Sequence, residues 1–195
     1  MNERTPIPNI NIGQVYDQRY SDAEVHYDKL GNLAGFFGRN MPVHRHDRYF
    51  QVHYVKSGTV RVYLDDQQYV ESGPMFFLTP PTIPHSFVTE PDADGHVLTV
   101  RQQLVWQLLE ADPALAPGPQ VAPACVALSG LEGRFADEAR RLVLLFDEVP
   151  PASRKRLLEL VGHVRELDEL VLELLSYSRL YNADQARERV EVSLL

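Results

Sequence analysis

The sequence has few cysteines and no long apolar run. Cys125 is the single cysteine among 195 residues, so no disulfide can form within the chain. No stretch of about 18 apolar residues is present, which argues against a membrane-spanning helix, and the N-terminus has no signal-like pattern. These absences predict a cytoplasmic protein that has no membrane partner.

Basic charge is also scarce. The chain carries 19 Lys and Arg against 27 Asp and Glu, a formal net charge of -8. Because binding to the phosphates of DNA requires a surplus of Lys and Arg on one face, we do not expect this chain to bind DNA by itself. The hydrophobic content of 44% is that of an ordinary globular protein, so the chain is expected to fold around a core.

The region from about Glu24 to Val100 is rich in short runs of β-forming residues separated by turn residues. These runs are EVHYDKL, LAGFFG, FQVHYV, TVRVYL, PMFFLT, HSFVTE and HVLTV. Such spacing is typical of an all-β sandwich or barrel. After Val100 the period changes, and RQQLVWQLLE predicts a short amphipathic helix that buries Leu104, Trp106 and Leu108.

The C-terminal third is predicted to be helical, with one segment at about 136–148 and another at about 153–181. In the second segment, apolar residues alternate spacings of three and four: Leu157, Leu160, Val164, Leu167, Val171 and Leu174. This seam predicts either a helix packed on its own domain or a dimerisation helix, and both can hold at once.

Two histidines one residue apart, His44 and His46, lie in the stretch MPVHRHDRYFQ. On a strand they point to the same face, because side chains alternate with period two. Gln51 follows after a four-residue gap, and His85 ends the proline-rich run TPPTIPH. If the sheet curls, these four side chains face a common interior point, and His53 shares the face of Gln51.

Two runs resemble the motifs of the cupin superfamily. GRNMPVHRHDRYFQVHYVKSG (38–58) is similar to the first motif spacing for spacing, and GPMFFLTPPTIPHSF (73–87) is similar to the second, with His85 at its ligand position. The resemblance implies a mainly β fold, a cupin (double-stranded β-helix, jelly-roll) barrel followed by a helical segment. Two positions depart from the pattern: Gln51 replaces the usual Glu, and Thr82 replaces the usual Gly.

The chemistry of the histidines leaves three alternatives open. His44, His46 and His85 are a competent ligand set for a divalent metal such as Zn, Fe or Ni, although the amide of Gln51 adds no negative charge. The same side chains could instead donate hydrogen bonds to a bound organic molecule, or simply pack. No metal is therefore required, and a metal-dependent cupin enzyme, such as a dioxygenase or isomerase, is the alternative to a binding domain.

A second resemblance covers roughly residues 10–109. The N-terminal stretch IPNINIGQVYD and the phrases HRHDRYFQVHYV, FFLTPPTIPHSF and DGHVLTVR are similar to the effector-binding half of AraC/XylS-type transcription activators, above all to regulators of 4-hydroxyphenylacetate catabolism. This implies a non-enzymatic domain that binds a small aromatic acid inside the barrel and forms a homodimer. Contact with DNA would be made only through a helix-turn-helix domain that is not part of this chain.

The resemblance also implies a division of the chain and a binding site. The expected segments are an N-terminal arm (1–22), the cupin barrel (23–110), a loop (111–135), a helical dimerisation segment (136–182) and a linker towards the DNA-binding domain (183–195). The candidate effector-binding residues are His44, His46, Gln51, His53, Phe76, His85 and Phe87, with Leu78 as a further apolar neighbour. Strand alternation turns Arg45 and Arg61 outward, and Arg39 is also expected in solvent.

Overall fold

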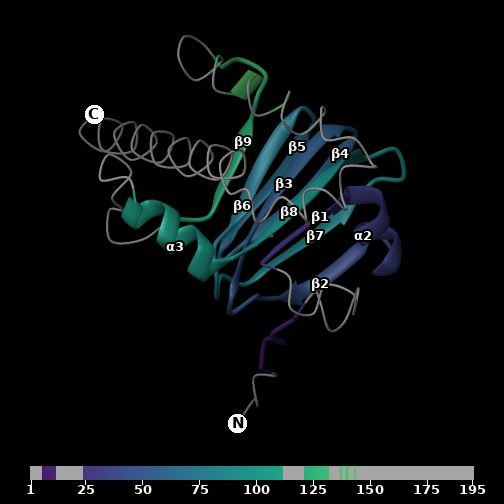
Figure 1. Ribbon diagram of the computed structural model, residues 1–195. Coiled ribbons are helices and arrows are strands. Elements are labelled where there is room, and N and C mark those ends of the chain that lie inside the picture. The colour runs from purple at the N-terminus through teal and green to yellow at the C-terminus, as the bar shows by residue number, and fades with distance from the viewer. Residues whose placement is uncertain are drawn as a thin grey trace, which may run out of the picture.

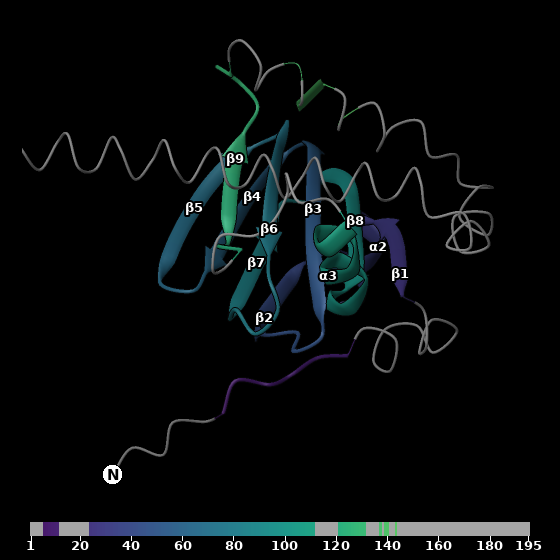
Figure 2. The ribbon, with the colours of Figure 1, turned by 60° about the vertical axis from the view of Figure 1, so that its left-hand side comes forward.

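The computed structural model describes residues 6–11, 24–111 and 121–131, together with residues 137, 139, 140 and 143 of a helical segment. Its strands form two antiparallel sheets that face each other (Figures 1 and 2). The larger sheet has the order β1 (Val25–Lys29), β8 (Asp94–Arg101), β3 (Tyr49–Ser57), β6 (Met75–Thr79) and β9 (Ala124–Ala127). The smaller sheet has the order β2 (Asn40–His44), β7 (His85–Thr89), β4 (Thr59–Leu64) and β5 (Gln67–Ser72). The predicted mainly β fold is thus confirmed.

The space between the two sheets, here called the interior, is filled largely by apolar side chains. Side chains alternate between the two faces of a strand, so each strand contributes every second residue to the interior. The interior cluster contains residues from both sheets, including Val55, Val60, Val62, Leu64, Met75, Phe77, Phe87, Val97 and Cys125. On β3 the first seven residues are buried, because the outer face of the larger sheet is covered as well.

The cover on that outer face includes α3 (Gln102–Ala111), which the sequence predicts (Figure 2). Val105 of this helix is fully buried and packs in the outer cluster with Phe50. Trp106, expected to be buried, is 37% exposed and touches Phe50 edge-on at 6.0 Å between ring centroids. Leu104 is only partly buried. The side chain of Leu108, the third residue expected to be buried, lies outside the described residues.

Besides β5 (Gln67–Ser72), which is not among the predicted runs, two elements were not predicted from the sequence. The run LAGFFG, expected as a strand, belongs largely to a helix, α2 (Leu30–Phe36). Its buried residues Leu30, Leu33 and Ala34 have the spacing of one helical face. The other is β9, which pairs with β6 and lies in the segment expected to be a loop. A four-residue strand is too short to show a clear alternation in sequence.

Of the predicted C-terminal helices, residues 137, 139, 140 and 143 are helical in the structure. The whole apolar seam from Leu157 to Leu174 lies outside the described residues, so its role in dimerisation stays a prediction. In the ranges that the structure describes, none of the helices has the length and apolar character needed to cross a bilayer.

Candidate functional site

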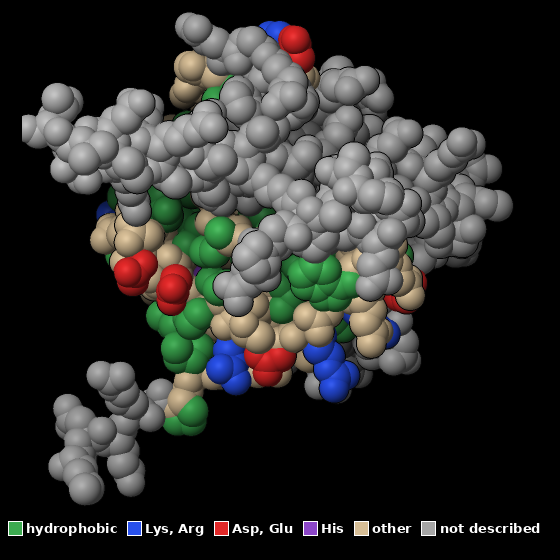
Figure 3. Space-filling view, turned by 90° about the vertical axis from the view of Figure 1, so that its left-hand side faces the viewer, with side chains coloured by type: hydrophobic (Ala, Val, Ile, Leu, Met, Phe, Trp, Pro, Cys, Tyr) green, Lys and Arg blue, Asp and Glu red, His purple; other side chains and the backbone are tan. Residues whose placement is uncertain are grey.

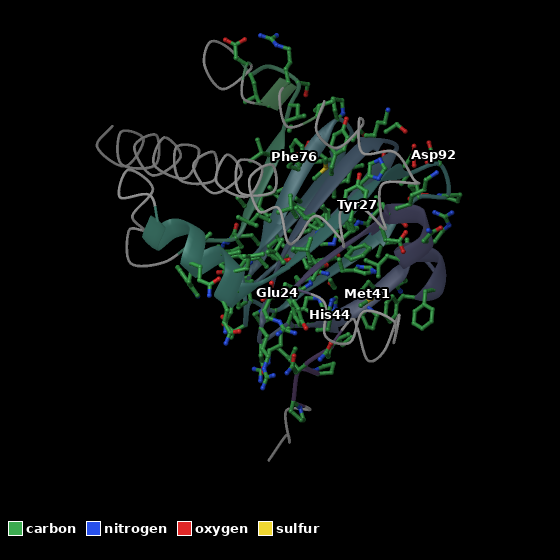
Figure 4. The ribbon with its side chains drawn as sticks, viewed as in Figure 1. Glu24, Tyr27, Met41, His44, Phe76 and Asp92 are labelled. Carbon is green, nitrogen blue, oxygen red and sulfur yellow. The ribbon has the colours of Figure 1, made fainter. Side chains whose placement is uncertain are left out.

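Three of the predicted histidines meet at one end of the interior. His44 ends β2 and is the register partner of His85, the first residue of β7. Their ring centroids are 4.2 Å apart, and the ring of His46 lies 4.8 Å from that of His44 and 5.1 Å from that of His85. All three side chains are buried, and Figure 4 shows His44 near Met41 at the lower end of the sheets. We call these three residues the histidine cluster.

Backbone carbonyls fix the tautomer of each histidine in the cluster. Nδ1 of His44 donates to the carbonyl of Pro42 at 2.7 Å, because a carbonyl oxygen can only accept. Nδ1 of His46 donates in the same way to Ile10 at 2.5 Å, and Nδ1 of His85 to Ile83 at 2.9 Å. A neutral imidazole that donates through Nδ1 keeps a lone pair on Nε2. Among the described residues, Nε2 of His46 and of His85 has no hydrogen-bond partner.

The loop between β6 and β7 holds His85 and His46 in place. Thr82 in this loop has a φ of 70°, a left-handed conformation that a β-branched residue rarely adopts. Its backbone N–H donates to the carbonyl of His46 at 3.0 Å. The glycine that the cupin motif usually has at this position would adopt the same backbone without a Cβ penalty.

Gln51 lies on the inward face of β3, with 2% of its surface exposed. Its amide nitrogen donates to the hydroxyl of Thr99 on β8 at 3.1 Å. This bond assigns the NH₂ group, so the amide oxygen is the atom left for a further partner. The amide of Gln51 also favours the charged form of His46. Gln51 is thereby held next to the cluster, where it offers an acceptor without a negative charge.

His53 lies two residues further along β3 and is completely buried. Its ring stacks on Phe77 at 4.0 Å between centroids, with an interplanar angle of 7°, and meets Phe87 edge-on at 5.5 Å. Neither ring nitrogen of His53 has a hydrogen-bond partner in the described part of the chain. A buried polar group without a partner costs about 1–3 kcal/mol, so this imidazole is a candidate to receive a ligand or water.

Of the two predicted aromatic residues, Phe87 faces the interior from the smaller sheet, whereas Phe76 faces the outer side of the larger sheet. Phe87 is part of the interior cluster together with Phe77. Phe76 instead lies in the outer cluster and stacks on Tyr54 at 4.9 Å between centroids. Leu78 lies on that outer side as well. Phe76 and Leu78 therefore do not join the histidines, and Phe77, which the sequence analysis did not select, takes the inward position.

The electrostatics keep the imidazoles neutral. Burial, and then the neighbouring His46, lowers the pKa of His44 from its ordinary value of 6.5 to about 4. Burial also lowers the pKa of His46, and it lowers the pKa values of His53 and His85 well below 6.5, with the other histidines adding to the effect. Near neutral pH these side chains therefore carry no charge and offer lone pairs and N–H groups.

The donor set of the histidine cluster fits a divalent metal. One nitrogen from each of the three side chains can be chosen so that all lie within 4.8 Å of one another. A hydrogen bond from the other ring nitrogen to a carbonyl is the support that metal-ligating histidines usually have. The three residues could thus hold Zn, Fe or Ni through Nε2, and such an ion would polarise an oxygen atom of a bound molecule. The amide oxygen of Gln51 is a weaker fourth donor than a carboxylate.

A segment of the predicted N-terminal arm lies directly against the site (Figure 1). Residues 6–11 run beside the chain at Arg45, and Asn9 forms a parallel bridge with that residue. Ile10 contributes both its N–H, which donates to the carbonyl of Arg45, and the carbonyl that accepts from His46. The arm is thereby connected to the cluster by a hydrogen bond to a candidate binding residue.

The three arginines considered in the sequence analysis do not reach the site. Arg61 is exposed on β4. Arg45 forms an ion pair with Asp47 at 3.0 Å, and Arg39 donates to the carbonyl of Glu90 at 3.2 Å. Sequence reasoning did overlook Thr99, whose alternation on β8 would have placed it inward.

The comparisons with known proteins come from sequence and from structure. A family model described as the AraC-like ligand binding domain matches residues 28–177. Similar solved structures include KdgF from Halomonas sp., at 29% identity and a TM-score of 0.30, covering 31% of this chain and 57% of that chain. The AraC-like transcriptional activator CuxR is similar at 12% identity and a TM-score of 0.39, covering 68% of this chain and 42% of that chain. A cupin-2 domain protein from Shewanella frigidimarina follows at 16% identity and a TM-score of 0.31, covering 40% and 69%.

The chain thus spans less than two thirds of the length of KdgF and of CuxR. No curated protein is significantly similar to the chain.

Proposed function

The chain belongs to the family of AraC-like ligand-binding domains, and on that premise we propose that it senses a small aromatic acid for a transcription regulator. The proposed effector is 4-hydroxyphenylacetate or a close relative, bound between the two sheets. The proposal rests on one observation: the site contains neutral, buried histidines whose ring nitrogens have no hydrogen-bond partner among the described residues. His53 is one of them. The domain itself would not be an enzyme, and it would act on DNA through a separate domain.

The chemistry of the site suits a phenol. A phenolic hydroxyl can donate to the Nε2 lone pair of His46 or His85, and it can accept from an N–H of His53. The rings of Phe77 and Phe87 supply apolar surface beside His53. An aromatic ring in contact with them would gain burial and stacking energy. Apolar walls with a few well-placed polar groups are the usual composition of small-molecule sites.

The arm offers a route for the signal. His46 would contact the effector through Nε2 while its Nδ1 donates to Ile10 of the arm. A change at the effector-binding side of this ring would therefore alter the bond that holds the arm. Effector binding moves the arm only if the effector binds its two arrangements with different affinity. In the whole regulator, the change in the arm would be transmitted to the DNA-binding domain through the predicted helices.

Calorimetric titration of the chain with 4-hydroxyphenylacetate tests the proposal. We expect binding that His53→Leu and Phe87→Leu each weaken by about tenfold or more, since each would remove a contact worth about 1.4 kcal/mol. Phe76→Leu is the matched control, because Phe76 is also a buried aromatic residue but packs in the outer cluster of the larger sheet. No heat of binding from the wild-type chain would exclude this effector.

The second candidate function is a metal-dependent cupin enzyme. It is favoured by one observation: one ring nitrogen from each residue of the histidine cluster lies within 4.8 Å of the others, and each Nδ1 atom donates to a backbone carbonyl. Elemental analysis of the purified chain distinguishes the two functions. A stoichiometric redox metal together with turnover of an aromatic substrate would support the enzyme, whereas metal-free protein that binds the effector would exclude it. Zinc alone would not decide, since it also serves structural roles.

We also propose that the chain forms a homodimer through the apolar seam of its last predicted helix. Sedimentation of the wild type and of Leu167→Asp tests this directly, because a buried charge in the seam would separate the two copies. A wild-type chain that is already monomeric at micromolar concentration would show that the seam packs only within its own chain.

A further inference from the structure

A second polar feature lies where β3 and β8 end. A cavity of about 300 Å³ is lined by Arg48, Arg101, Gln102 and Gln103. Arg101 closes β8 opposite Tyr49, and α3 begins at the next residue. The N–H of Gln102 donates to the carbonyl of Arg48 at 2.8 Å, which holds the two cationic residues at the same edge.

The charge of this cavity is positive. Arg48 and Arg101 contribute two cationic guanidinium groups. In the described ranges, no acidic side chain forms an ion pair with either arginine or lines the cavity. The nearby carboxylate of Asp47 is paired with Arg45. The first N–H groups of α3 also point towards this end of the helix, where the helix dipole favours an anion.

The same end of the molecule holds the histidine cluster. In Figure 3, Lys and Arg side chains lie along the lower edge, with acidic atoms between them. Arg48 lies two residues after His46, and Tyr49, the next residue, pairs with Arg101 on β8. The cationic cavity therefore lies at the end of the larger sheet where β3 begins, close in sequence to the histidine cluster.

Strand alternation places Arg101 on the inward face of β8. Thr99 on β8 faces inward, because its hydroxyl accepts from the amide of Gln51. Val100 faces the outer cluster, so Arg101 returns to the inward face. Two residues along a strand span about 7 Å. Arg101 therefore lies about 7 Å along β8 from Thr99, whose hydroxyl accepts from Gln51 beside the histidine cluster.

The histidines leave one need of an acidic effector unmet. Among the residues that the structure describes, no Lys or Arg is buried, so the interior itself offers a carboxylate no cationic partner. Guanidinium groups bind carboxylates in a two-pronged geometry that a neutral imidazole cannot provide.

We propose that Arg48 and Arg101 bind the carboxylate of the effector at the mouth of the interior, so that the domain selects organic acids over their neutral analogues. This inference rests on the proposed function and adds the charge of the ligand and the residues that recognise it. Inorganic phosphate and an organic carboxylate both carry oxyanions that two guanidinium groups could bind. The test distinguishes these two kinds of ligand.

The test compares 4-hydroxyphenylacetate with its neutral amide, 4-hydroxyphenylacetamide, by calorimetry on the 195-residue chain. We expect the acid to bind at least tenfold more tightly than the amide. Arg101→Gln and Arg48→Gln should each weaken the acid by about 10- to 100-fold and leave the amide unchanged. Arg61→Gln, which removes an exposed arginine from β4, is the matched control and should change neither compound.

The outcomes separate the inference from the proposed function. Equal binding of acid and amide, or an Arg101→Gln chain that binds the acid as the wild type does, would overturn the inference while the sensor proposal stands. If neither compound binds, inorganic phosphate is titrated while the side-chain Nε–H signal of Arg101 is followed by NMR. A shift of that signal would support the anion site and place the failure with the proposed effector, whereas an unmoved signal would overturn both.

Discussion

Acidification should destabilise the protein through the buried histidines, and His44 allows the effect to be calculated. Its pKa is about 4 in the folded chain against 6.5 in its ordinary state. Above pH 6.5 the imidazole is neutral in both states, and its contribution to stability is fully present. As the pH falls through this window, the unfolded chain binds a proton that the folded chain does not, so folding is progressively disfavoured.

The magnitude follows from the two pKa values. Between the two pKa values, the free energy of unfolding falls by about 1.4 kcal/mol for each pH unit. The loss of stability due to His44 is therefore about 2 kcal/mol at pH 5 and approaches about 3 kcal/mol below pH 4. His46, His53 and His85 have pKa values shifted in the same direction, so the whole chain should lose more than this amount. The total would be a large fraction of the 5–15 kcal/mol that stabilises a typical domain.

Urea unfolding at pH 7.5, 6.5, 5.5 and 5.0, in the presence of a chelator, measures the effect. We expect the free energy of unfolding to fall between pH 7.5 and 5.0, and His44→Gln to reduce that fall by about 2 kcal/mol. Val62→Ala is the control, because it removes methyl groups from a fully buried position without removing a titratable group. It should lower stability equally at every pH. A His44→Gln chain with the same pH dependence as the wild type would refute the reasoning.

Three further predictions concern single residues, each measured by urea or thermal unfolding at pH 7.5. Thr82→Gly should stabilise the chain by about 1 kcal/mol, because it relieves a left-handed β-branched residue; a loss of stability would show that the φ of 70° carries no strain. Gly58→Ala should destabilise the chain by about 1–3 kcal/mol or more, since Gly58 has a φ of 79° and an added Cβ would lie 2.5 Å from Cα of Ala93. An unchanged stability would contradict this close approach. His53→Leu should raise the stability of the ligand-free chain by about 1 kcal/mol, because it removes two unpartnered buried nitrogens; a clear loss would mean that His53 already has a partner.

The spacing of His44, His46 and His85, through its resemblance to the cupin motifs, allowed the cluster to be predicted. The reasoning from strand alternation was wrong for His46, because β2 ends at His44. The choice between Phe76 and Phe77 did not follow from the sequence. Both residues are buried, since the sheet is covered on both faces, and an apolar run on such a strand does not show which side faces the interior. Arg48 and Arg101 were missed for a related reason, since they are far apart in sequence and meet only at the edge where β3 pairs with β8.

The sequence by itself determined the β-rich pattern, the histidine spacing and the neutral amide at Gln51, because each of these depends on residue type and short-range period. Tertiary structure alone decided the chemical state of the site. The carbonyl of Ile10, 36 residues away along the chain, fixes the tautomer of His46, and burial between the two sheets lowers its pKa. Hydrogen-bond partners and desolvation are properties of the packed fold, so no local pattern could reveal that these histidines are neutral and have free lone pairs.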